Sequence, residues 1–89
     1  WIILVQQEIE VTNPTGFHAR PAALLVARAS KSKSKVSILF NDKTVNVKSM
    51  LNLLGAGIRQ GSRIVLVVEG EDERQTLADL VQLIEQLPE

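Results

Sequence analysis

The sequence predicts an α+β fold, an open-faced β-sandwich in which three helices cover one face of a four-stranded antiparallel sheet. Two observations lead to this prediction. Hydrophobic residues recur with period two in some segments and with helical spacing in others. The segments follow the order strand, helix, strand, strand, helix, strand, helix, which is typical of an antiparallel sheet with helices on one side. Because aromatic residues make up 3% of a chain that is 45% apolar, we expect an aliphatic core.

The first part of the chain predicts a strand and a helix joined by a turn. Charged and apolar residues alternate toward the end of residues 5–11, which indicates a half-buried strand. Turn-forming residues fill positions 12–16. Apolar residues at helical spacing then predict a helix that begins near His18 and ends around residues 30–33. Pro21 fits the first turn of this helix, where its missing N–H group costs nothing.

A hairpin and a short helix follow. Alternating apolar residues predict strands over residues 36–40 and 44–47, with a tight turn at residues 41–43. Ser49 has the chemistry of an N-cap, because its hydroxyl can accept a hydrogen bond from a free backbone N–H group. It therefore predicts a short helix over residues 50–54.

The last part of the chain predicts a central strand and a final helix. Residues 64–68 are all apolar, which is typical of a strand buried on both faces of a sheet. Gly70 interrupts the pattern, and the acidic Asp72 and Glu73 fit the first turn of a helix, where negative charge is favoured. One apolar stripe then runs along that helix: Leu77, Leu80, Val81, Ile84 and Leu87.

We expect residues 5–89 to form a single domain and residues 1–4 to be an N-terminal extension or linker. The chain does not begin with methionine, so we interpret it as a processed product or as a domain of a longer polypeptide. The apolar residues at its start are too few for a signal sequence or a membrane span, and we expect no membrane insertion.

Composition argues against several kinds of site. Ten basic and ten acidic side chains leave no net charge, so the balance gives no reason to expect nucleic-acid binding. The lysine-rich residues 31–35 lack an aromatic neighbour on which bases could stack. With no cysteine and one histidine, the chain is expected to hold no metal and no other cofactor.

The single histidine, His18, lies where the first helix is predicted to begin, in the segment Gly16-Phe17-His18-Ala19-Arg20-Pro21. Free backbone N–H groups, the positive end of a helix dipole and the Arg20 guanidinium together favour an anion. An imidazole inside an anion site indicates chemistry on a phosphoryl group. On composition alone, a helix cap or a surface position is the more common role of a lone histidine, and Arg20 also fits a solvated first-turn residue.

Two blocks of sequence resemble HPr, the histidine phosphocarrier family of the bacterial phosphoenolpyruvate-dependent sugar phosphotransferase system. The first block is Gly16-Phe17-His18-Ala19-Arg20-Pro21-Ala22, and the second is Val45-Asn46-Val47-Lys48-Ser49-Met50. They occur in the family's order and on the same succession of elements. Gly61 and the acidic segment 69–73 also fit, and the resemblance extends from about Val5 to Leu87.

The resemblance implies that His18 accepts a phosphoryl group on its ring nitrogen Nδ1 from Enzyme I and passes it to sugar-specific IIA domains. Arg20 would stabilise the phosphoryl group. Ser49 matches a serine that some bacteria phosphorylate with an ATP-dependent HPr kinase, and a transcription regulator is a further expected partner. The protein would be a cytoplasmic monomer and a substrate of enzymes rather than an enzyme. The expected partner-binding surface consists of Phe17, Met50, Leu51 and Leu54. Of the last three residues, we expect some to be buried in the core and Leu51 to be exposed.

The sequence departs from the family pattern at three places, and one of them is that residues 1–4 extend beyond the usual start of the family. Phe17 replaces a commoner aliphatic residue. Ser32 stands where the family often has Phe or Tyr, so we expect looser packing at the end of the first helix. The alternative function is that of a regulatory interaction module of the same fold, controlled by phosphorylation of Ser49. A small nucleic-acid-binding module is a third possibility, which the balanced charge disfavours.

Overall fold

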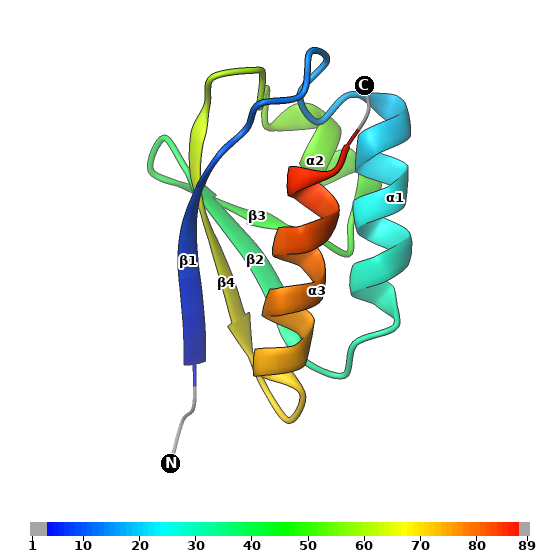
Figure 1. Cartoon of the computed structure of the whole chain (residues 1–89), viewed down its shortest axis with the longest axis vertical. Coiled ribbons are helices and arrows are strands. Elements are labelled where there is room, and N and C mark those ends of the chain that lie inside the picture. Colours follow the sequence, from blue (N-terminus) through cyan, green and yellow to red (C-terminus); the bar gives the residue numbers. More distant parts are fainter. Residues whose placement is uncertain (1–3, 88–89) are drawn as a thin grey trace.

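Figure 1 shows the computed structural model of the chain, which describes residues 4–87. The succession of elements is the predicted one. Their bounds are β1 (Leu4–Glu10), α1 (Ala19–Ser30), β2 (Lys35–Phe40), β3 (Lys43–Asn46), α2 (Met50–Gly55), β4 (Arg63–Glu69) and α3 (Glu73–Glu85). β1 includes Leu4, which pairs with Glu69, so the sheet begins inside the segment assigned above to an extension. The rest of that segment, residues 1–3, lies outside the described residues.

The four strands form one antiparallel sheet in the order β1-β4-β2-β3. β4 therefore lies inside the sheet, as its apolar run predicts. Its residue Ile64 faces Ile9 of β1, and Leu66 faces Ile38 of β2. Ile38 in turn pairs with Val45 of β3, so a row of aliphatic side chains crosses β4, β2 and β3, and the Ile64–Ile9 pair two residues earlier in β4 extends the same face to β1.

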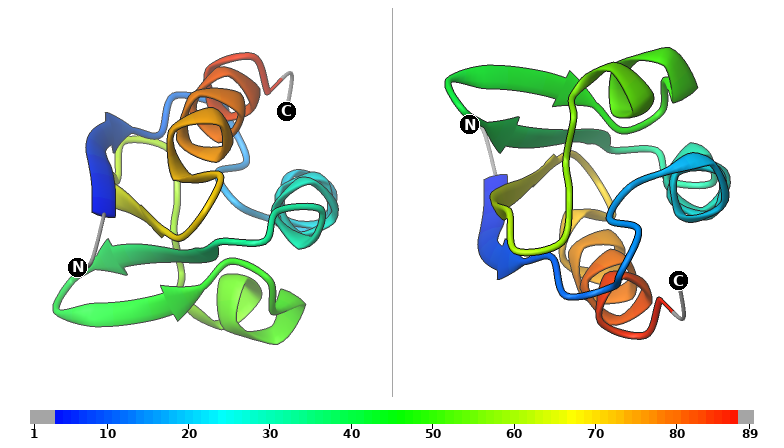
Figure 2. Two further views of the ribbon diagram at one scale, coloured as in Figure 1. Left: turned by 90° about the horizontal axis from the view of Figure 1, so that it is seen from below. Right: turned by 90° about the horizontal axis from the view of Figure 1, so that it is seen from above.

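All three helices cover the same face of this sheet, as the two end-on views in Figure 2 show. The core lies between the helices and the sheet and is aliphatic apart from Phe17. Its fully buried large side chains include Leu25, Ile38, Leu53, Ile64, Leu66, Leu80 and Ile84. This arrangement confirms the predicted fold class.

The expectation that β4 is buried on both faces is wrong. Burial alternates along the strand: Ile64, Leu66 and Val68 are buried, whereas Val65 and Val67 are only partly buried. The reason is that the helices cover only one face of the sheet. The other face leaves the second row of valines in partial contact with solvent.

At the end of the molecule away from His18, hydrogen bonds around Asp72 join the α1–β2 connection to the start of α3. The Asp72 carboxylate accepts hydrogen bonds from the Ser32 hydroxyl at 2.8 Å, from the Ser34 hydroxyl, and from the Lys33 backbone N–H at 3.2 Å. These bonds, that from Ser34 above all, hold the pKa of Asp72 well below its ordinary range. The Ser32 hydroxyl also lies 2.8 Å from the Thr76 hydroxyl. Ser32 is thus hydrogen-bonded to two residues near the start of α3, and it also lines a hollow of about 190 Å³ at this helix end, so the looser packing expected there stays a prediction.

Candidate functional site

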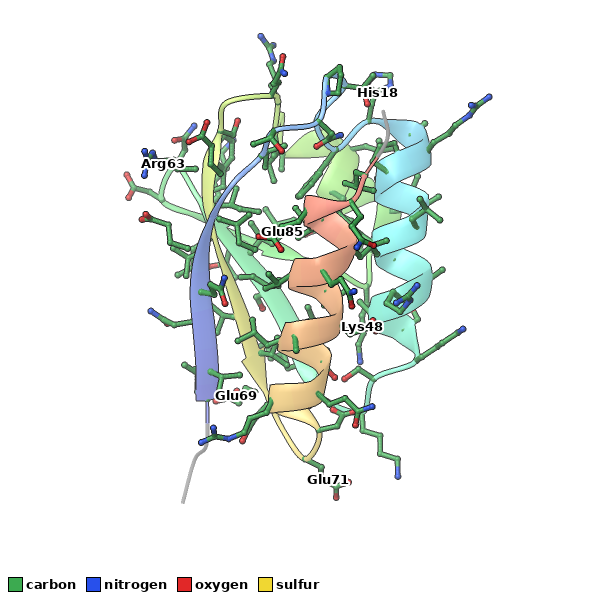
Figure 3. All side chains as sticks on the ribbon, viewed as in Figure 1. His18, Lys48, Arg63, Glu69, Glu71 and Glu85 are labelled. Carbon is green, nitrogen blue, oxygen red and sulfur yellow. The ribbon has the colours of Figure 1, made fainter. Side chains whose placement is uncertain are left out.

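His18 is the N-cap residue of α1, immediately before its first helical residue. Its backbone is extended (φ −79°, ψ −171°), and its carbonyl accepts the first hydrogen bond of the helix, from Ala22 N–H at 2.8 Å. The imidazole makes no capping hydrogen bond, and the residue is exposed. Figure 3 shows His18 at the top of the molecule, at the start of α1. The single imidazole of the chain is therefore exposed to solvent beside the positive end of a helix dipole.

Close backbone contact fixes the loop before His18. Gly16 has a positive φ of +61°, and a Cβ added there would lie 2.6 Å from the Ile58 carbonyl oxygen and from Arg59 Cα. A glycine is therefore required for two reasons, backbone conformation and space. The Phe17 N–H group donates to the Ile58 carbonyl at 3.2 Å, which adds a direct link between the two loops.

The buried residue Asn13 holds this loop from inside. Its Nδ2 atom donates to the Gly16 carbonyl at 2.7 Å, and the Gly16 N–H donates to the Asn13 carbonyl at 3.1 Å. The sequence indicated only a turn at residues 12–16. An asparagine beside Pro14 was the one signal of a side chain that bonds its own loop.

Arg20 lies in the first turn of α1 and is exposed. It lines a shallow hollow of about 480 Å³ together with His18, Thr15, Ala19 and Pro21. The first turn of α1 contains no acidic residue, although negative charge is favoured there. The structure therefore brings the imidazole and the guanidinium to one hollow at a helix N-terminus, as expected.

A second shallow hollow of about 450 Å³ adjoins His18 on the side of the α2–β4 connection. Its lining includes Leu54 at the end of α2 and Arg59 in that connection. Sequence reasoning did not select Arg59, because it is 41 positions away in the chain and belongs to neither motif. Only the contact between the two loops places it at the site.

Ser49 caps α2 as predicted. Its hydroxyl oxygen accepts hydrogen bonds from the Asn52 backbone N–H at 3.3 Å and from Asn52 Nδ2 at 3.1 Å. Ser49 is half-buried, and the next turn of α2 presents apolar side chains to solvent. Leu51 is 83% exposed and Leu54 is 43% exposed.

The residues expected to form a docking surface divide into two groups. Leu51 and Leu54 are exposed and Met50 is partly buried, so these three form a solvent-facing apolar patch on α2. The buried member of this helix is Leu53, which was not among the expected residues. Phe17 is 2% exposed, and the expectation that it contacts partners is wrong because its ring lies in the core.

Within residues 4–87, no group of three or more histidine, cysteine, aspartate or glutamate side chains is arranged to hold a metal ion. In the same part of the chain, no helix has the length and apolar character needed to cross a membrane.

Comparison with known proteins identifies close relatives. Residues 5–86 match the family described as the PTS HPr component phosphorylation site. The phosphocarrier protein HPr of Buchnera aphidicola (subspecies Acyrthosiphon pisum) is 40% identical over 84 residues, which cover 94% of this chain and 99% of that protein. The crystal structure of HPr from Thermoanaerobacter tengcongensis superimposes with a TM-score of 0.89 at 43% identity, covering 91% of each chain. Crh of Bacillus subtilis, a catabolite repression protein crystallised as a domain-swapped dimer, gives a TM-score of 0.75 at 38% identity over 92% of this chain and 94% of that one.

Proposed function

The chain belongs to the HPr family, the phosphocarriers of the phosphotransferase system, and on that premise we propose that His18 carries a phosphoryl group from Enzyme I to sugar-specific IIA domains. Members of this family are phosphocarriers and not enzymes, and the same holds for this chain. The observation that carries the proposal is the position of His18, the only histidine. It is an exposed imidazole at the N-terminus of α1, in one hollow with Arg20.

The proposed transfer uses one ring nitrogen of His18, which the family resemblance identifies as Nδ1. This nitrogen forms a bond to phosphorus while the bond from phosphorus to the donor group of Enzyme I breaks. The acceptor domain reverses the step: its nucleophile takes the phosphorus and the N–P bond of His18 breaks. The imidazole makes no capping hydrogen bond to the helix. Accepting or releasing the phosphoryl group therefore breaks no capping bond of α1.

The groups around His18 suit a reversible carrier. A helix N-terminus stabilises an exposed anion by about 0.3–1 kcal/mol. A charge-assisted hydrogen bond from an arginine such as Arg20 adds about 1.5–3 kcal/mol. Both hollows beside His18 are shallow, so the phosphoryl group stays accessible to the next protein. Such modest stabilisation lets the carrier release its cargo as readily as it accepts it.

The apolar patch of Met50, Leu51 and Leu54 is the proposed docking surface. It adjoins the reacting group, because Leu54 and His18 line the same hollow. An exposed apolar group beside a reactive side chain is the arrangement expected of a protein–protein contact centre. Phe17 is buried, and it lines the same hollow as Leu54 and His18.

Incubation with phosphoenolpyruvate and Enzyme I tests the proposal. The mass of the wild-type protein should rise by one phosphoryl group, and the adduct should be labile to acid. His18→Ala should remain unmodified while keeping the unfolding midpoint of the wild type, because the imidazole makes no structural hydrogen bond. A wild-type protein that stays unmodified would contradict the proposal.

Arg20→Ala tests the role of the guanidinium separately. We expect slower transfer from Enzyme I with little change in stability, since Arg20 is exposed. Transfer at the wild-type rate would remove Arg20 from the mechanism.

A second function, regulation through Ser49, is favoured by the similarity to Crh and by the place of Ser49 at the N-cap of α2. Phosphoserine at a helix N-terminus is compatible with the helix, while its charge would lie beside Leu51. Incubation with ATP and an HPr kinase should modify the wild type but not Ser49→Ala. Binding of the modified protein to a transcription regulator would support this function, and absence of modification would contradict it.

The proposed setting is a cytoplasmic monomer. The swapped dimer of Crh makes the oligomeric state a direct test. Sedimentation of the purified protein over a range of concentrations should give the mass of one chain, and a stable dimer would contradict this part of the proposal.

A further inference from the structure

Arg59 lines a hollow beside His18 that Arg20 does not line. The two hollows beside the imidazole share Thr15, His18 and Ala19, and they differ in the guanidinium that lines each one. Arg20 lines the first and Arg59 lines the second. Each of the two hollows that His18 lines therefore also contains a cationic side chain.

The backbone of Arg59 is held firmly at this place. Its N–H group donates to the Ser62 hydroxyl at 3.0 Å, and its carbonyl accepts from the Ser62 N–H at 3.0 Å. The same connection is tied to the end of β1 by bonds from Gly61 N–H to the Val11 carbonyl at 2.6 Å and from Val11 N–H to the Ser62 carbonyl at 2.8 Å. The loop thus presents Arg59 from a fixed position.

The charge of Arg59 is not neutralised within the described residues. No carboxylate of residues 4–87 forms an ion pair with it, whereas Arg28 pairs with Asp79 and Arg63 pairs with Glu8. No acidic residue lines the hollow that Arg59 shares with His18. An exposed arginine beside a nucleophile, without an acidic partner, is suited to bind an anion that arrives on that nucleophile.

We infer that Arg59 is a second cationic contact for the phosphoryl group carried by His18. This inference rests on the proposed function and deepens it. Arg20 contacts the group from the first turn of α1, and Arg59 approaches it across the second hollow. A phosphoryl group with about two negative charges then lies between two guanidinium groups.

The test uses a small phosphoryl donor, so that it does not depend on Enzyme I. Phosphoramidate phosphorylates imidazole directly. A ring nitrogen of His18 bonds to phosphorus, the P–N bond of the donor breaks, and its protonated amine leaves as ammonia while the second ring nitrogen keeps its proton. Because the chain has one histidine, the product has a single phosphorylated ring. Failure of transfer from Enzyme I would contradict the proposed function and leave this test intact.

Phosphorus NMR then follows the protonation of the phosphoryl group with pH. A nearby cation favours the more charged form, so Arg59→Gln should reduce the acid dissociation constant of this group about two- to fivefold. Arg59→Lys should keep most of the wild-type value. Arg59→Met gives a second neutral variant if the first does not fold.

Arg74→Gln is the matched control, because Arg74 is an exposed arginine in α3 that lines neither hollow. It should titrate as the wild type does. The inference is overturned if the folded neutral variants of Arg59 titrate like the wild type and Arg74→Gln.

Discussion

The His18 end and the Asp72 end of the molecule both depend on a glycine that lets two loops touch, but their polar groups are used differently. Gly16 allows its loop to contact Arg59, and Gly70 allows its loop to contact Ser34, where an added Cβ would lie 2.7 Å from Ser34 Cα. At the Asp72 end, serine hydroxyls and a backbone N–H group all donate to one carboxylate. At the His18 end, the imidazole and the Arg59 guanidinium have no such partner among residues 4–87.

The polar groups at the Asp72 end therefore contribute to the stability of the fold, whereas those at the His18 end are placed for function. Figure 3 shows the two ends at opposite poles, with His18 at the top and Glu71 at the bottom. Polar groups that satisfy one another hold helices and strands together, whereas polar groups without a partner are available to a ligand. Substitutions at the two ends should therefore affect different measurements.

The largest effect is expected when the two glycines are replaced. Gly16→Ala and Gly70→Ala both force a Cβ against backbone at a positive φ, and each should destabilise the fold by about 2–4 kcal/mol. Urea unfolding measures this loss. Phosphorylation of the folded protein should slow only in Gly16→Ala, because that loop carries His18. Equal phosphorylation rates in the two variants would show that the ends are not functionally distinct.

The Asp72 end should determine the response of stability to acid. The hydrogen bonds that lower the pKa of Asp72 stabilise its ionised form in the folded state. This contribution is complete above the ordinary aspartate pKa of about 3.9 and is lost as the pH falls further, toward the lowered folded pKa. Urea midpoints of the wild type should therefore drop below about pH 4 more steeply than those of Asp72→Asn.

Phosphorylation of His18 at neutral pH serves as the control, and its rate should not differ between the wild type and Asp72→Asn.

Ser34→Ala removes a hydrogen-bond donor to the Asp72 carboxylate. Because this bond is the largest cause of the lowered pKa of Asp72, the urea midpoint of Ser34→Ala should fall less steeply with acid than that of the wild type. Identical acid profiles for all three proteins would exclude Asp72 as a source of acid sensitivity.

Ser49 allows the cap and the charge at α2 to be separated. Ser49→Ala removes the hydroxyl that accepts from Asn52 N–H and should cost about 1 kcal/mol in thermal or urea unfolding. Ser49→Asp keeps an acceptor at the N-cap and should preserve stability, while its charge beside Leu51 slows transfer from Enzyme I. Transfer at the wild-type rate by Ser49→Asp would argue against control through charge at this position.

The smallest effect on stability is expected at Leu51. Because this side chain is 83% exposed, Leu51→Ala should change the unfolding free energy by no more than about 0.5 kcal/mol. It should nevertheless raise the Enzyme I concentration needed for half-maximal transfer. Leu53→Ala is the contrast, since that buried side chain should cost about 2–5 kcal/mol. An unchanged concentration dependence in Leu51→Ala would remove Leu51 from the docking surface.

Local patterns predicted the elements and their order because period two and helical spacing are properties of neighbouring residues. Ser49 illustrates this: its cap bond reaches only three positions along the chain, to Asn52. β4 is an example of a property that a local pattern does not predict. A run of five apolar residues does not reveal that helices cover only one side of the sheet, and the partial exposure of Val65 and Val67 follows from packing alone.

The site divides in the same way. Sequence by itself determined that His18 and Arg20 share the start of a helix, because the chain places them two positions apart. Only the tertiary structure decided that Phe17 is buried, that Gly16 touches the α2–β4 connection, and that Arg59 and Leu54 border the imidazole. The physical reason is distance along the chain. Helix starts and caps depend on neighbouring residues, whereas a contact across some 40 residues exists only when the whole core places both loops at one end.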